Sequence, residues 1–129
     1  MKTQTEIFQL CDIVRETSFA LQCYLRHGHL EKVYENGLVH RLVRQAPRFC
    51  SNTGCRCLTK TAHRSATISL TFWLGGELVV ELKACKALTD EYVAQFPGYL
   101  RGCRIEHGLL VNFGSRKLEV RKYVLSEAI

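Results

Sequence analysis

Apolar residues recur at helical spacing in two segments near the start of the chain. Residues 5–25 carry them at Ile7, Leu10, Cys11, Val14, Leu21 and Leu25. Residues 30–43 carry them at Leu30, Val33, Tyr34, Leu38 and Leu42. Both spacings predict amphipathic helices. Gly28 separates the two segments, and Pro47 is expected to end the second helix.

The pattern then changes to one typical of β-strands. Residues 49–61 are ambiguous, with a turn expected at 51–54. Residues 66–74 alternate and are rich in β-branched and aromatic side chains, and residues 77–85 fit a return strand after the Gly75–Gly76 pair. If residues 75–77 form a three-residue loop, Leu74 pairs with Leu78 and Thr71 lies opposite Glu81; a two-residue turn would place Leu70 there instead.

A third helix is expected from Thr89 to about Cys103, because Thr89 is a good N-cap and Asp90 and Glu91 follow it in the first turn. Two more strands fit residues 106–113 and 117–125. The order is therefore two helices, two or three strands, a helix and two strands. It predicts an α/β fold in which helices flank a mixed central sheet.

Length and composition fit one globular domain spanning residues 1–129. No apolar run is long enough to cross a bilayer, and the first residues do not resemble a secretory signal. Seven cysteines without such a signal predict free thiols and a cytoplasmic protein. Cys11, Cys23, Cys85 and Cys103 are expected in the core. Cys50, Cys55 and Cys57, near His63, lack the usual spacing of a zinc site, so metal binding there stays open.

Positive charge is concentrated in one part of the chain. The formal net charge is +6, and residues 36–76 contain no Asp or Glu. A field of that sign attracts nucleic acid, although a solvated basic face is the alternative interpretation. The candidate contacts to nucleic acid are Arg41, Arg44, Arg48, Lys60 and Arg64.

The strand segment VVELKA at residues 79–84 is the strongest chemical signal. The two-residue period of a strand places Glu81 and Lys83 on one face and Val80 and Leu82 on the other. A carboxylate beside a lysine suits metal-assisted hydrolysis, in which the carboxylate holds a divalent cation and the lysine acts on the attacking water or the phosphate. A simple surface ion pair is the alternative.

Besides this strand, the chain contains GHLEKVY at residues 28–34 and HGLLVNFG at residues 107–114. In this order the segments resemble the GxxExxY family of the PD-(D/E)XK nuclease superfamily. Residues 28–34, GHLEKVY, match the signature that names it, and residues 76–84 resemble its ExK strand. Gln95 and Tyr99 are similar to a Q-xxx-Y motif on the next helix, and residues 107–114, HGLLVNFG, are similar to its GLLxNFG strand. The resemblance covers about residues 5–125.

The resemblance implies a restriction-endonuclease-like core and a Mg²⁺- or Mn²⁺-dependent nuclease ancestry. It places Glu31 and Glu81 as metal ligands and Lys83 and Gln95 as catalytic side chains. Glu31 and Gln95 also fit ordinary helix-surface positions, Tyr34 is expected in the helix core, and residues 112–114 are expected to be a strand end and turn.

Two residues depart from the family pattern. Thr71 stands where the family has an Asp, which removes one carboxylate from the expected metal site. Pro97 lies between Gln95 and Tyr99, where a proline is expected to kink or restart the helix.

The sequence supports two functions. One is metal-assisted hydrolysis of nucleic-acid phosphodiesters, with activity reduced by Thr71. The other is a catalytically inactive module on the same fold that binds nucleic acid or assembles with protein; a homodimer is also left open.

Overall fold

The computed structural model describes residues 3–45, 58–61, 70–74 and 77–125. Within these ranges the order of elements is α1 (Gln4–Leu25), α2 (Glu31–Arg44), β1 (Leu58–Thr61), β2 (Leu70–Leu74), β3 (Leu78–Lys83), α3 (Asp90–Cys103), β4 (His107–Asn112) and β5 (Glu119–Val124). The predicted order is confirmed, with three strands before α3. The predicted turn at 51–54 lies outside the described residues.

The two N-terminal helices begin and end close to the predicted residues. A capping box starts α1, because the Thr3 hydroxyl accepts a hydrogen bond from the Glu6 amide and the Glu6 carboxylate accepts one from the Thr3 amide. The predicted stripe on α2 is wrong at two positions, since Leu30 and Val33 are exposed. Leu30 is the N-cap of the helix, before its regular periodicity begins.

The described strands form one mixed sheet in the order β1-β2-β3-β4-β5. β3 and β4 are parallel, and the other neighbours are antiparallel. In the β2–β3 hairpin Leu74 pairs with Leu78 and Thr71 pairs with Glu81, so the register expected from a three-residue loop is confirmed.

Helix α3 makes the crossover between the parallel strands β3 and β4. The Thr89 hydroxyl accepts a hydrogen bond from the Tyr92 amide and caps the helix, as predicted. A restart of the helix at Pro97, one of the two expected outcomes, is wrong, because α3 runs from Asp90 to Cys103 with Pro97 inside it. Phe96 and Leu100, on either side of the proline, are both buried. Their burial holds the two halves of the helix against the sheet and offsets the missing backbone hydrogen bond.

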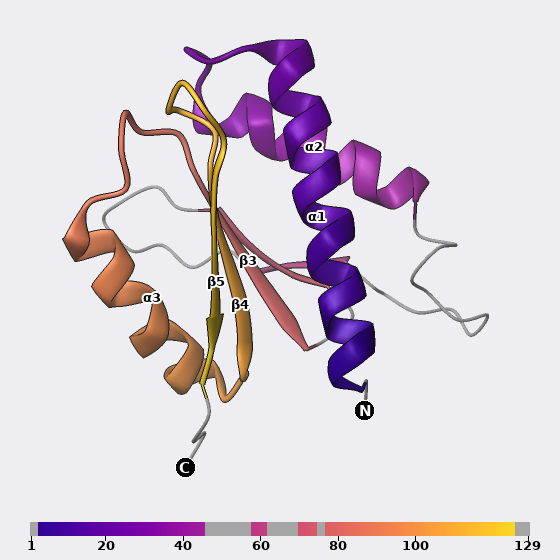
Figure 1. Ribbon diagram of the computed structural model, residues 1–129, viewed down its shortest axis with the longest axis vertical. Coiled ribbons are helices and arrows are strands. Elements are labelled where there is room, and N and C mark those ends of the chain that lie inside the picture. Colours follow the sequence, from indigo (N-terminus) through magenta and orange to yellow (C-terminus); the bar gives the residue numbers. More distant parts are fainter. Residues whose placement is uncertain (1–2, 46–57, 62–69, 75–76, 126–129) are drawn as a thin grey trace.

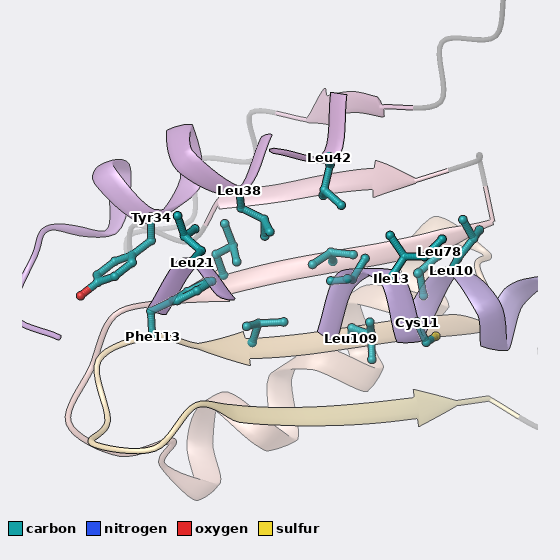
Figure 2. Packing of buried hydrophobic residues seen from close by; sticks show 14 of the residues in the cluster. Leu10, Cys11, Ile13, Leu21, Tyr34, Leu38, Leu42, Leu78, Leu109 and Phe113 are labelled. Carbon is teal, nitrogen blue, oxygen red and sulfur yellow. The ribbon is translucent and has the colours of Figure 1, made fainter. Parts of the chain in front are cut away.

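The helices cover opposite faces of the sheet, with α1 and α2 on one side and α3 on the other (Figure 1). The larger apolar cluster joins α1 and α2 to Leu78, Val80 and Leu82 of β3 (Figure 2). The smaller cluster joins α3 to Val79 and Leu110. Adjacent β3 residues therefore serve different cores, as the two-residue period of a strand requires.

Of the four cysteines expected in the core, one lies there fully and one in part. Cys11 is buried, Cys85 is half-buried, and Cys23 is exposed, so the expectation for Cys23 is wrong. Cys23 lies on the outer surface of α1, where its neighbour Gln22 is the residue that faces the sheet. The Cys103 side chain and Cys50, Cys55 and Cys57 lie outside the described structure. No helix in the described residues is both long and apolar enough to cross a membrane.

Candidate active site

Glu81 and Lys83 lie in the second half of β3, near the end of the sheet where Tyr34 and Phe113 meet (Figure 2). Lys83 is buried, and its Nζ lies 4.4 Å from the centroid of the Tyr92 ring on α3. This contact places the Lys83 side chain on the α3 face of the sheet. By the alternation of the strand, Glu81 is on the same face.

The loop before α2 delivers Glu31 to this end of the sheet. Gly28 has φ +101°, a conformation that is open to glycine and strained for other residues. The Tyr34 hydroxyl donates a hydrogen bond to the Arg26 carbonyl at 2.5 Å and accepts one from the His29 amide at 3.3 Å. The Tyr34 ring stacks on Phe113 at 4.8 Å. Tyr34 is therefore a core residue, as expected, and it anchors the loop that ends at Glu31.

Electrostatic interactions connect Glu31 to the two β3 residues. The pKa of Glu31 is raised to about 7: burial raises it most, the positive charge of Lys83 opposes the rise, and the negative charges of Glu81 and Glu35 add to it. Residues some fifty positions apart in the sequence thus lie close enough to influence one another's charge. The tertiary structure brings Glu31, Glu81 and Lys83 into one region.

Glu35 is a member of this region that the sequence reasoning did not single out. It lies one helical turn after Glu31, is 2% exposed, and contributes to the raised pKa of Glu31. Its position in the sequence could have indicated its burial, because it follows Tyr34 directly and precedes Leu38 by three residues, and both of these are buried. A carboxylate on a buried helical stripe is rare enough to mark a functional or structural role.

At the position where the resemblance predicts a further carboxylate, the chain has a threonine. Thr71, on β2, is the direct partner of Glu81, and its side chain lies outside the described structure. Within the described residues, no group of three or more His, Cys, Asp or Glu side chains is placed to hold a metal ion. Mg²⁺ in proteins is commonly held by one or two carboxylates, with water and substrate phosphate completing its shell. The hard oxygen donors of Glu31 and Glu81 fit that reduced arrangement.

Gln95 and Tyr99 occupy different environments on α3. Gln95 is exposed and lies three residues after Tyr92, the residue beneath Lys83. Tyr99 is half-buried and packs against the apolar cluster between α3 and the sheet. The Q-xxx-Y pair is therefore divided between solvent and core.

Of the predicted contacts to nucleic acid, the structure places only two side chains. Arg41 and Arg44 lie on the last turn of α2, and the Arg41 guanidinium lies 5.7 Å from the centroid of the Tyr24 ring. The Lys60 backbone is in β1, but its side chain is outside the described structure, as are Arg48 and Arg64.

Asn112, at the end of β4, holds the site's backbone in place. Its Oδ1 accepts hydrogen bonds from the Cys85 and Gly114 amides, each at 3.0 Å. Its Nδ2 donates to the Cys85 carbonyl at 2.9 Å and to Glu119 at 3.0 Å. A Cβ on Gly114 would lie 2.4 Å from the Cys85 backbone, so only glycine permits this approach. The NFG segment is thus a strand end and turn, as expected, and it positions the chain just after Lys83.

Comparison with known proteins identifies the fold family. A family model described as the PD-(D/E)XK nuclease superfamily matches residues 9–123. No curated protein and no solved structure shows a significant match. The matched region contains every described helix and strand except the first residues of α1 and the last residue of β5. The chain therefore belongs to the PD-(D/E)XK nuclease superfamily.

Proposed function

We propose that the protein is a nuclease-like phosphodiesterase that hydrolyses nucleic acid with the help of a divalent metal ion. The observation that carries this proposal is the buried Lys83, whose Nζ lies 4.4 Å from the centroid of the Tyr92 ring, on the same face of β3 as Glu81. The raised pKa of Glu31 on α2, to which both charges contribute, supports a shared site. Superfamily membership supports a nucleic-acid substrate. The loop before α2 also supports placement in the GxxExxY family. In it Gly28 adopts a positive φ and Tyr34 anchors the backbone, and Glu31 of the same signature follows the loop.

In the proposed mechanism Glu31 and Glu81 would hold Mg²⁺ or Mn²⁺, which when bound would activate water and neutralise phosphate charge. Lys83 would orient or deprotonate the attacking water, or steady the phosphate. Its rotation is limited by burial and by the Tyr92 ring, so its nitrogen is held in one region of the site. Gln95, exposed on α3, would position the substrate.

Thr71 sets the expected level of activity. A threonine opposite Glu81 supplies no carboxylate, so the site has fewer anionic ligands than its superfamily pattern. We therefore propose weak cleavage that requires high metal concentration. Cytoplasmic localisation and homodimer formation stay predictions from the sequence.

The test is cleavage of end-labelled single- and double-stranded DNA and RNA with Mg²⁺ or Mn²⁺. Glu81→Gln and Lys83→Met should each lower the rate about 100-fold or more, because each removes a group that interacts with developing charge. Glu106→Gln, an exposed carboxylate before β4, is the matched control and should leave the rate unchanged. Wild-type protein without cleavage, or cleavage retained in both site variants, would exclude the proposed activity.

A catalytically inactive nucleic-acid-binding or assembly module is the second candidate, and the Thr71–Glu81 pairing favours it. In that case Lys83 simply neutralises buried acidic charge. Calorimetric titration with Mn²⁺ separates the two candidates. Binding by Thr71→Asp but not by wild type would support the inactive module, whereas binding by wild type that is lost in Glu81→Gln would support the enzyme.

A further inference from the structure

A groove lies between α1 and the β4–β5 hairpin, away from Glu81 and Lys83. Its volume is about 1040 Å³. Arg15, Phe19 and Arg26 line one wall, and Arg116, Lys117 and Val120 line the other. We call it the α1–β5 groove. Its size lies at the upper end of the range for ligand pockets.

The two walls are fixed by contacts at both ends of α1. Near the start of the helix, Lys122 Nζ lies 3.4 Å from the centroid of the Phe8 ring. Near its end, Gln22 Nε2 donates hydrogen bonds to the carbonyls of Phe113 at 3.3 Å and Ser115 at 3.1 Å. These contacts fix the position of α1 relative to the β4–β5 hairpin, so the groove is part of the fold itself. Its width is held by side chains that bridge the helix and the sheet.

The groove combines positive charge with an exposed aromatic ring. Arg15 on α1 and Arg26 at its C-cap face Arg116 and Lys117 on the hairpin, and Glu16 is the acidic residue that the described structure places among them. Arg15 also lies 3.6 Å from Asp12, but this bridge is exposed and weak. Phe19 is 60% exposed at the groove, although burying its ring would be favourable.

We propose that the α1–β5 groove binds single-stranded nucleic acid. Cations on both walls match a chain of phosphates, and a flat exposed ring between them is a platform on which a base can stack. A duplex keeps its bases stacked on one another, so it would not use Phe19. An acidic peptide would match the charge, but it would not require an aromatic platform.

The groove also runs toward the loop that carries the candidate active site. His27 lines its end, and the carbonyl of neighbouring Arg26 accepts the Tyr34 hydroxyl that anchors the loop before Glu31. The groove therefore borders the loop that leads to α2. This binding needs no metal and no cleavage, so it goes beyond the proposed catalytic function.

The test measures fluorescence anisotropy of labelled oligo(dT) of about 15 nucleotides in EDTA, over a range of salt concentrations. Phe19→Ala should weaken binding about tenfold or more, and Phe19→Tyr should retain it. The double variant Arg116→Gln/Lys117→Gln should also weaken binding. The magnitude of its slope of log K against log salt should be smaller than that of wild type by about 1.4, since two phosphate contacts are lost.

Two matched variants control for charge and for aromatic content. Arg101→Gln/Arg121→Gln removes two exposed cations from α3 and from β5, and Tyr24→Ala removes an exposed ring outside this groove. Both should bind like wild type. The proposal is overturned if wild type does not bind, if the control variants weaken binding equally, if duplex DNA binds as tightly, or if poly-glutamate of similar charge displaces the oligonucleotide as well as unlabelled oligo(dT) does.

The same assay separates this inference from the proposed catalysis. Glu81→Gln should bind oligo(dT) normally in EDTA. Normal binding without any metal-dependent cleavage would exclude only the catalytic proposal. Metal-dependent cleavage by the wild-type protein, together with normal oligo(dT) binding by Phe19→Ala, would exclude only the groove proposal.

Discussion

At the scale of single residues, the site concentrates negative charge in a place that solvent reaches poorly. The pKa of Glu31 is raised from 4.5 to about 7 because burial and the charges of Glu81 and Glu35 disfavour its ionised form. The folded state therefore holds this proton more tightly than the unfolded state does. Its stabilising contribution is complete below about pH 4.5 and is lost as the pH rises to about 7.

We expect Glu31→Gln to stabilise the metal-free protein at pH 8 but not at pH 4.5. The full pKa shift corresponds to about 3 kcal/mol, and partial exposure of Glu31 reduces the expected effect to about 1–2 kcal/mol. Urea denaturation in EDTA across this pH range measures it. Glu16→Gln, at an exposed position on α1, is the control. An equal free energy of unfolding for wild type and Glu31→Gln at pH 8 would contradict the interpretation.

At the scale of elements, local patterns predicted most helix and strand bounds to within a few residues. They did so because each helix keeps one regular apolar period against a single core, and the side chains of each strand alternate between the two faces of the sheet. They were wrong at Leu30 and Val33, since helical spacing does not show which part of a stripe the sheet covers. They were also wrong in allowing a restart of the helix at Pro97, because the local cost of a proline does not include the packing of Phe96 and Leu100 on the sheet.

Pro97→Ala should stabilise the protein, because an alanine amide restores the missing backbone donor inside α3. We expect a gain of about 1–3 kcal/mol in the free energy of unfolding, measured by urea denaturation. Gly98→Ala is a suitable comparison, since a Cβ there meets open space and should add about 1 kcal/mol. A loss of stability in Pro97→Ala would show that α3 depends on the conformation that proline imposes.

At the scale of the whole molecule, β3 and β4 form the centre on which both helical layers pack. Their residues supply Val80, Leu82, Leu109 and Val111 to one core and Val79 and Leu110 to the other. Residues of β5 are at most half-buried. Stability should therefore be unequal across the sheet.

Native-state hydrogen exchange measured by NMR tests that inequality. The amides of Leu82 and Leu109 should exchange only through global unfolding, whereas amides of β5 should also exchange through local opening at low denaturant. Equal exchange free energies for β3, β4 and β5 would show that the sheet opens as a single unit.

The sequence by itself determined the order of helices and strands and the common face of Glu81 and Lys83. It also limited the hairpin register to two alternatives, and the structure has the one that pairs Thr71 with Glu81. These features depend on local periods and loop lengths that neighbouring residues carry. Only the tertiary structure decided that Glu31 and Glu35 lie beside that strand, and that Arg15 and Arg26 face Arg116 and Lys117 across a groove. Such proximities depend on how a helix crosses a sheet, which is set by the packing of both cores and not by any local pattern.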